Sequence, residues 1–306
     1  MARQNTVFLY ARVSKVPKID RNSETGEYNY GMMYVDVVRG PRDVGDDVNY
    51  PKHDHPLIIS REKELLDKMA VLKENSIVYI KGVLSTKKMT KRSFCPNCTD
   101  EDGNARENLV EGNLVFVTPI YIEHVKDYLE KSEAVEDIVK NREISNQLYV
   151  IGDLLKDPKL VTTKKGLRFT QYPIAINRKY TIRTDDPSIK TDWPVVKSYG
   201  ENALEDKMRL MYQSTVMIDG CLQARRVHRK KKCDFCGEEY TWDDNLMEIV
   251  PYAMEYLGEY KSDDDIEKER QQTAEEYRQM LFDGYKDDIT DKESDEFHLD
   301  TDEANE

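Results

Sequence analysis

The sequence predicts an all-β protein with short helices, built from two five-stranded Greek-key barrels of the OB type in tandem and followed by an acidic C-terminal tail. Three observations predict this fold: the chain repeats itself, each copy has the strand order of such a barrel, and the composition shifts after residue 258. At 306 residues the chain is long enough for two domains, each with its own core.

The internal repeat is clearest around two C-x-x-C pairs. IKGVLSTKKMTKRSFCPNC starts at Ile80 and IDGCLQARRVHRKKKCDFC starts at Ile218, an offset of 138 residues. After each pair comes Asn-Leu, and a proline follows five residues after the leucine. Because a strand, a basic arm, a cysteine pair and a second strand recur together, we interpret the halves as copies of one fold.

Each copy shows three strands, a short helix and two further strands. The alternating apolar runs VFLYARV and MMYVDVV in the first copy, and QLYVIGDLL and RFTQYPIAI in the second, indicate strands. Apolar residues at helical spacing follow in both copies: Leu65, Leu66, Met69 and Leu72, then Leu204, Met208 and Met211. Two more strands flank the basic arm, and this order is typical of an OB barrel.

These elements divide the chain into four parts. We expect the first barrel at residues 1–126, a helical linker at 127–143 within a charged stretch from 124 to 145, the second barrel at 144–258 and the tail at 259–306. The tail holds 19 acidic and 6 basic side chains, which leaves 40 of each in residues 1–258. A neutral body can still present a basic groove, so the low overall pI does not exclude nucleic acid.

The sequence pattern of the tail predicts one helix. Residues 262–285 form an amphipathic pattern that opens at Ser262, and one side carries Ile266, Arg270, Tyr277 and Met280 or Leu281. The segment from Lys286 onward is predicted to be disordered, because it is acidic and poor in apolar residues.

The location is predicted from what the chain lacks. No stretch approaches the roughly 18 apolar residues of a membrane-spanning helix, and the polar N-terminal residues do not form a secretory signal. We therefore expect a cytoplasmic protein without a membrane partner. Five cysteines, four of them in C-x-x-C pairs, agree with a reducing compartment.

The second copy resembles the opening of bacterial single-stranded DNA-binding proteins (SSB). Residues 146–180 show the family's apolar strand, Gly-x-Leu, Asp-Pro, Thr-x-x-x-Gly turn and Ala-x-Asn-Arg strand end. TDWPVVKSYGENALE continues the likeness, with Trp193 before a strand and an aromatic-glycine pair at Tyr199 and Gly200. The resemblance covers about 110 residues well, and it reaches the first half only through the repeat.

The resemblance implies a protein that coats or protects single-stranded DNA with little sequence preference, in replication, recombination or DNA transfer. It places stacking aromatic residues at Tyr180, Trp193 and Tyr199. The family has another tryptophan in the arm. Val227 aligns with it here, so this stacking ring is missing.

The first copy departs further from the family. The first copy has His55 in place of Trp193 and Arg61 in place of Tyr199. Met89 aligns with the arm tryptophan of the family. The DNA-binding role of the first barrel is therefore left open, and a mainly structural role is the alternative.

Bases and phosphates require different side chains. An aromatic ring stacked on a base contributes about 1 to 3 kcal/mol whatever the base, and phosphates require cations nearby. The candidate cations lie in a turn, beside Tyr180 and in the basic arm: Lys164, Lys165, Arg178, Arg225, Arg226, Arg229, Lys230, Lys231 and Lys232. In the alternative interpretation Trp193 and Tyr199 are core or interface residues and the lysines form a solvated face.

The cysteine pairs predict a structural zinc. Such a site requires about four ligands, and the pairs occupy the same hairpin of two related barrels. The simplest proposal is one site shared by the four cysteines of both hairpins, within one chain or between chains: Cys95, Cys98, Cys233 and Cys236.

Two alternatives remain for the pairs. Separate sites could recruit His53 or His55 in the first hairpin and His228 in the second, and the pairs could also be redox-active or metal-free. Cys221 aligns with Val83 on a strand, so we expect it in the core.

Three classes of function remain at this point. Passive single-stranded DNA binding is favoured, and an OB-fold scaffolding or interaction module of a replication or conjugation complex, with weak or no DNA binding, is the alternative. An enzyme is not expected, because the sequence has no K-x-D-G motif, no P-loop and no close carboxylate cluster outside the tail.

The family likeness also suggests that the tail docks DNA-processing proteins through Phe297 and Leu299, with a purely solubilising tail as the alternative. Two barrels per chain permit a monomer or a homodimer.

Overall fold

The computed structural model describes residues 4–40, 51–184 and 186–287, and its secondary structure is mostly β. The first half contains β1 (Asn5–Val13), β2 (Lys18–Arg21), β3 (Tyr28–Val38), β4 (His53–Asp54), β5 (Leu57–Ser60), α1 (Lys63–Ala70), β6 (Ser76–Thr99) and β7 (Ala105–Asp127). Two helices follow: α2 (Lys131–Lys140) and α3 (Arg142–Ser145). The second half contains β8 (Gln147–Leu154), β9 (Lys159–Thr162), β10 (Arg168–Asn177), β11 (Thr191–Asp192), β12 (Val195–Tyr199), α4 (Gly200–Arg209), β13 (Thr215–Lys232) and β14 (Glu239–Gly258), before the long α5 (Asp263–Asp287).

Each half closes into a five-stranded barrel. In the first half β1 pairs with β6, β6 with β7, β7 with β5, β5 with β3, and β3 returns to β1. The second half repeats this circuit with β8, β13, β14, β12 and β10. The one parallel step in each circuit joins the third strand to the last, at Ile58↔Val117 and Val196↔Ile249. This order, with a helix between the third and fourth strands, confirms the predicted OB barrels.

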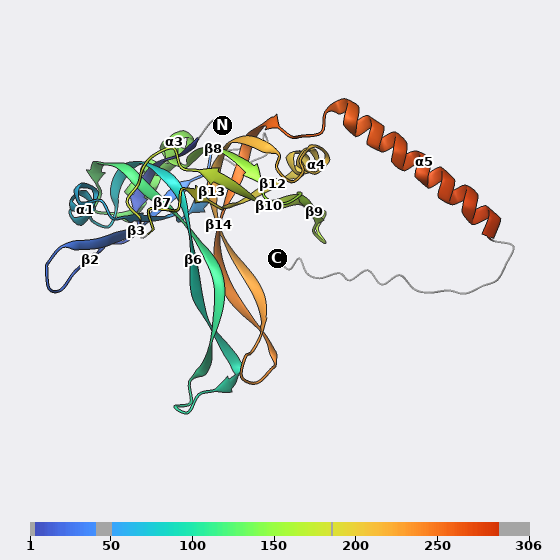
Figure 1. Ribbon diagram of the computed structural model, residues 1–306. Helices are drawn as coiled ribbons and strands as arrows, with labels where there is room; N and C mark the ends of the chain where they lie inside the picture. Colours follow the sequence, from blue (N-terminus) through green and yellow to red (C-terminus); the bar gives the residue numbers. More distant parts are fainter. Residues whose placement is uncertain (1–3, 41–50, 185, 288–306) are drawn as a thin grey trace.

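The two barrels share one continuous sheet (Figure 1). β1 and β8 pair antiparallel, from Asn5↔Val150 to Phe8↔Gln147. Because inward-facing side chains of both strands are fully buried, a single apolar core runs through both barrels; it includes Val7, Leu9, Leu148 and Val150.

The two halves also repeat their polar contacts. The Asn5 side chain donates to the Leu84 carbonyl (2.9 Å) and accepts from the Leu84 amide (2.8 Å). Asn146 makes the same two bonds to Leu222, at 2.8 and 3.0 Å. Leu84 and Leu222 are separated by the 138-residue repeat offset, so the structure confirms that the halves are copies of one fold.

Two long hairpins leave the barrels and run side by side (Figure 1). They are formed by β6 with β7 and by β13 with β14, and the first is called arm 1 and the second arm 2 below. Each arm departs at a register shift beside a glycine, Gly82 in arm 1 and Gly220 in arm 2. A Cβ at Gly82 would lie 2.6 Å from the Thr118 carbonyl oxygen, and one at Gly220 would lie 2.5 Å from that of Val250. Only glycine allows this close approach of two backbones.

The connector differs from the predicted linker. β7 continues to Asp127, so residues 124–127 are strand, and the helical part starts only at Lys131. α2 is also not merely a charged spacer, because Ala134 and Ile138 are fully buried in a small core with Val38 and Ile77. Spacing by four residues places both apolar side chains on one side of the helix, where they cover the first barrel.

Helix α5 begins where the sequence predicted. The Asp265 amide donates to Ser262 Oγ (3.2 Å), and the Ser262 amide donates to Asp265 Oδ2 (3.1 Å), which is a reciprocal cap. The side chains of Tyr277, Met280 and Leu281 lie outside the described residues. So does the chain beyond Asp287, with Phe297 and Leu299. None of the described helices combines the length and apolar character required to cross a bilayer.

Candidate functional site

The four arm cysteines meet in one cluster within one chain. Cys95 Sγ lies 3.8 Å from Cys236 Sγ, and Cys98 Sγ lies 3.7 Å from Cys233 Sγ. All four sulfur atoms lie within 4.8 Å of one another. Thiolates bound tetrahedrally to zinc at about 2.3 Å lie about 3.8 Å apart, so the cluster has the dimensions of a four-thiolate metal site.

The structure does not favour the separate sites. Instead of joining a cysteine pair, His55 Nδ1 lies 2.5 Å from Asp36 Oδ1 and His228 Nδ1 lies 2.5 Å from Asp243 Oδ1. Within the described residues, the cluster that could hold an ion consists of the four cysteines without a histidine. Cys221 is fully buried on β13, which confirms its predicted core position.

The surroundings of the thiols differ. Burial raises the pKa of Cys98 to about 12 and also raises the pKa of Cys95. At Cys233 burial opposes ionisation, but hydrogen bonds from the backbone of Cys236 and Phe235 and from Asn108 outweigh it and lower the pKa to about 6. Donors that converge on a sulfur stabilise its thiolate form, which is the form that binds metal.

Asn108 joins the two arms beside the cluster. Its Nδ2 donates to Cys233 Sγ (3.4 Å), and its Oδ1 accepts from the Asp234 amide (2.9 Å). Farther along the arms, the Ser93 and Tyr240 hydroxyls lie 2.6 Å apart, and Lys91 forms an ion pair with Asp244. Asn108 was not predicted from the sequence, because its partners belong to the other arm.

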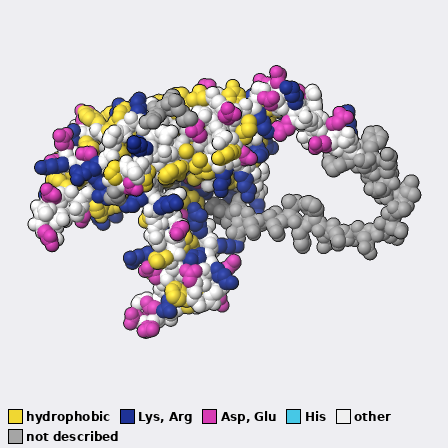
Figure 2. Space-filling view, viewed as in Figure 1, with side chains coloured by type: hydrophobic (Ala, Val, Ile, Leu, Met, Phe, Trp, Pro, Cys, Tyr) yellow, Lys and Arg dark blue, Asp and Glu magenta, His cyan; other side chains and the backbone are white. Residues whose placement is uncertain are grey.

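The basic run of arm 2 is largely paired with acids of the same hairpin. Arg225 contacts Glu248 at 3.0 Å, and Arg229 contacts Asp244 at 2.8 Å. Arg226 forms an ion pair with Asp243, and Lys231 contacts Asp234 at 3.1 Å. Figure 2 shows basic and acidic side chains interspersed along the arms. The arm therefore carries less net positive charge than the run of cations indicates.

Arg178 is also engaged. Its Nε donates to Asp192 Oδ2 (2.6 Å) and its Nη2 to Asp192 Oδ1 (2.8 Å), and both side chains are nearly inaccessible to solvent. It was predicted to lie at a phosphate, but in this structure its charge is paired with Asp192 and its side chain is only 8 % exposed. Lys164, Lys165 and Lys230 are exposed.

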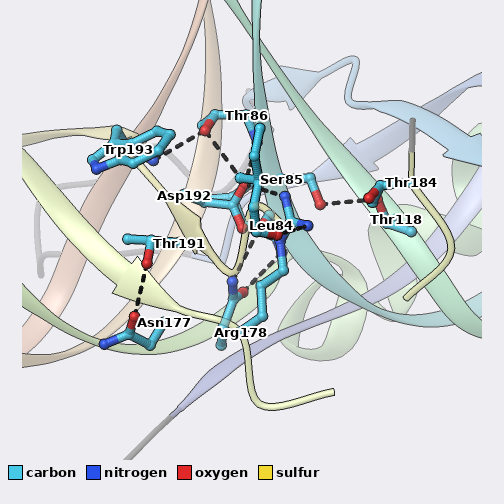
Figure 3. Close-up of polar contacts among 12 residues, drawn as sticks. Leu84, Ser85, Thr86, Thr118, Asn177, Arg178, Thr184, Thr191, Asp192 and Trp193 are labelled. Atoms are coloured by element: carbon cyan, nitrogen blue, oxygen red, sulfur yellow. Dashed lines mark hydrogen bonds and ion pairs between the residues drawn. The ribbon is translucent and has the colours of Figure 1, made fainter. Parts of the chain in front are cut away.

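Asp192 ties the second barrel to the base of arm 1 (Figure 3). It accepts a hydrogen bond from the Thr86 amide (2.7 Å), and the Trp193 amide donates to Thr86 Oγ1 (3.0 Å). Asp54 makes the equivalent contact in the other direction: it accepts from the Ala224 amide (2.7 Å) and pairs with Arg39 (2.7 Å). The base of each arm therefore binds an aspartate of the other barrel.

The predicted aromatic residues lie at the surface of the second barrel. Trp193 is 41 % exposed, so it is not a core residue, and Tyr199 and Tyr180 are half-buried. Lys179 and, from the first barrel, Lys81 both lie 5.7 Å from the Tyr180 ring centroid.

Two neighbours of Tyr199, Phe169 and Lys197, were not predicted from the sequence. The Phe169 ring lies 6.3 Å from that of Tyr199, because the two residues are cross-strand partners on β10 and β12. Lys197 Nζ lies 4.0 Å from the Phe169 centroid and 5.4 Å from the Tyr199 centroid. The strand alternation of RFTQYPIAI could have placed Phe169 on this face, but only the pairing of β10 with β12 brings it to Tyr199.

The fold and the site define a class of protein: two OB barrels in one chain, with surface aromatic residues on one barrel and two arms joined by four cysteines. Residues 145–235 match the model of the single-strand binding protein family. The matched segment lies within the second half of the chain, and in that segment the chain is similar to the single-strand binding protein family. The family is named for binding, in agreement with the prediction that the chain is not an enzyme.

Two relatives are similar to the chain in sequence, and a solved structure is similar to it in fold. The chain is 25 % identical over 133 residues to single-stranded DNA-binding protein 1 of Staphylococcus aureus strain MSSA476, which covers 44 % of this chain and 78 % of that protein. The same values apply to the single-stranded DNA-binding protein of strain MW2. In fold, the chain is similar to the wild-type single-stranded DNA-binding protein of Thermus aquaticus, with a TM-score of 0.50, 15 % identity and coverage of 85 % of this chain and 97 % of that one.

Proposed function

We propose that the protein binds single-stranded DNA with little sequence preference, chiefly on the outward face of β10 and β12. The observation that carries this proposal is the set of partly exposed rings on a barrel of the matched family: Phe169, Trp193 and Tyr199. The second and third strands are the face on which OB folds bind oligonucleotides. Stacking tolerates any base, so such a surface coats a strand without reading it.

Cations beside these rings would bind the phosphates. Lys164 and Lys165 lie exposed in the turn before β10. In the arm, Lys230 is exposed, and Arg226 and Arg229 lie beside carboxylates of the same hairpin. We therefore expect a modest salt dependence, with fewer phosphate contacts than the number of basic residues indicates.

Titration of single-stranded DNA, duplex DNA and single-stranded RNA at two salt concentrations tests the proposal. Trp193→Ala and Tyr199→Ala should each weaken single-strand binding roughly 5- to 100-fold, because a stacked base is lost. The exposed Tyr212→Ala, which lies outside this face, is the matched control. Equal, weak binding to all three nucleic acids would contradict DNA binding and favour the interaction-module alternative, which the self-neutralised arm also supports.

We further propose that Cys95, Cys98, Cys233 and Cys236 hold a structural zinc ion. The sulfur separations of 3.7 and 3.8 Å fit a tetrahedral thiolate site. Zinc would there hold the two arms together by a bridge between residues far apart in the sequence. Metal analysis of the purified protein should find about one zinc per chain, and Cys233→Ser should lose it. Protein purified without metal from zinc-containing medium would overturn this assignment.

We also propose the domain boundaries, the cytoplasmic location, the homodimer and the docking of DNA-processing proteins by the tail. The docking depends on residues outside the described part of the chain.

A further inference from the structure

We propose that Thr86, at the base of arm 1, is a positioning residue that holds the stacking ring of Trp193 on the second barrel in place for a base. The inference rests on the proposed function, because it concerns one ring of that site. It gives the first half of the chain a part in DNA binding through a contact between protein residues.

Thr86 contacts two consecutive residues of the second barrel (Figure 3). Its amide donates to Asp192 Oδ1 (2.7 Å), and its hydroxyl donates to the same oxygen (3.3 Å). The hydroxyl oxygen also accepts a hydrogen bond from the Trp193 amide (3.0 Å). Because Asp192 is fully buried, the loop is fixed to arm 1 directly before the ring.

The bond to the Trp193 amide fixes the backbone from which the ring projects. Pro194 follows, and a residue before proline is restricted to extended backbone. The Pro194 carbonyl accepts a hydrogen bond from the Ile174 amide (3.1 Å), so the chain is also anchored on the other side of Trp193. The Trp193 side chain is exposed, so it remains accessible to a base while its backbone is held.

The equivalent contact in the other half lacks the hydroxyl. Ala224 lies 138 residues after Thr86, and its amide donates to Asp54 (2.7 Å). The residue after Asp54 is His55, in place of the tryptophan. A hydroxyl is therefore present where the loop carries a stacking ring and absent where the loop carries a histidine. Since an amide bond alone joins the barrels at Ala224, the additional bond of Thr86 points to a role at the ring.

Tyr199 is also linked to the first half of the chain. Gln223 Nε2 donates to the Tyr199 hydroxyl (3.4 Å), and Gln223 Oε1 accepts from Arg39 Nη1 (3.1 Å). Arg39 in turn forms an ion pair with the buried Asp54 (2.7 Å). Two rings of the proposed DNA-binding surface are therefore held by contacts that begin in the first half. The bond to the tyrosine is the longer link, so Thr86 offers the clearer test.

A ring that is held before binding loses less conformational freedom when a base stacks on it. The cost of immobilising one side chain at an interface corresponds to roughly 2- to 12-fold in affinity. Thr86→Val keeps the shape of the side chain and the backbone bond to Asp192, but it removes the acceptor of the Trp193 amide. Thr86→Ser keeps the hydroxyl and should bind DNA as the parent does.

The test uses a parent protein with Trp242→Phe, so that Trp193 is the single tryptophan of the chain. Titration with oligo(dT) of about 10 nucleotides gives the affinity, and time-resolved fluorescence anisotropy without DNA gives the motion of the ring. Thr86→Val should weaken binding roughly 2- to 12-fold and increase the fast motion of Trp193, and Thr86→Ser should restore both. Thr99→Val, at an exposed position at the far end of the same strand, should change neither.

A double-mutant cycle shows whether Thr86 acts through the ring. With Trp193→Ala, the further change Thr86→Val should alter the affinity for a labelled oligo(dT) by less than about twofold. Equal weakening with and without the tryptophan would mean that Thr86 contacts the strand itself, and it would overturn the inference. Unchanged affinity and unchanged anisotropy in Thr86→Val would overturn it as well. If the parent does not bind the strand, the proposed function is overturned instead, and the anisotropy still shows whether Thr86 holds the ring.

Discussion

Asp192 shows how a single side chain couples two barrels. It is fully buried and accepts bonds from Arg178 and from the Thr86 amide of the other half. Asp192→Ala leaves a guanidinium charge unpaired in the interior, so we expect it to lower the free energy of unfolding by about 3 to 5 kcal/mol. Urea denaturation measures this loss. Arg178→Met in the same background should recover part of the loss, and an effect no larger than that of the exposed Glu201→Ala would contradict the coupling.

Asp206 gives a pH dependence at the same scale. Burial raises its pKa above the ordinary 3.8, and hydroxyl groups that include Ser198 and Tyr172 partly offset this. A carboxyl with a raised pKa in the folded state binds protons there more readily than in the unfolded chain. Its contribution to stability is therefore fully present below the unfolded pKa and is lost as the pH rises through the folded pKa.

We therefore expect the destabilisation by Asp206→Asn to be larger near pH 4 than near pH 7, as measured by urea denaturation at both values. The exposed Asp186→Asn offers a comparison, because hydrogen bonds from Ser188 outweigh the effect of burial and lower the pKa of Asp186. A destabilisation by Asp206→Asn that grows with pH would contradict the assigned direction.

At the scale of the structural elements, Asn108 of arm 1 joins the two arms. Asn108 is 1 % exposed and bridges Cys233 and Asp234, so it orients a cysteine of the other arm that we propose as a metal ligand. Residues in this role typically change metal affinity 10- to 100-fold when they are removed. We expect Asn108→Ala to weaken zinc retention by about this factor, measured by competition with a chromophoric chelator. Asn113→Ala, exposed on the same strand, should retain the parent affinity.

At the scale of the whole molecule the barrels share one sheet and one core. β1 and β8 pair across the junction, and a common core contains Val7 and Leu148. A contiguous core favours all-or-none unfolding, so we expect tryptophan fluorescence and circular dichroism to report one coincident transition in urea. Leu148→Ala should lower the free energy of unfolding by about 2 to 5 kcal/mol, and the protein should still unfold in a single transition. Two separate transitions would show that the barrels unfold independently.

Much of this architecture could be predicted from the sequence, because its signals are local or periodic. Alternation in VFLYARV and QLYVIGDLL predicted the strands, and the 138-residue offset predicted two equivalent hairpins with cysteine pairs. The predicted start of the helical linker was wrong. β7 continues to Asp127 because it pairs with β6, and the composition of the segment contains no signal for pairing with β6.

Local and periodic signals along the chain predicted two OB barrels, the two cysteine pairs and the aromatic residues Trp193 and Tyr199. That all four cysteines converge, that Arg178 is held by Asp192 and that Phe169 lies beside Tyr199 became evident only in the folded molecule. Each of these features joins residues that are distant along the chain. Periodicity reports what one strand does, whereas a metal-sized cluster, a buried ion pair and a cross-strand ring pair exist only after segments far apart in sequence have paired.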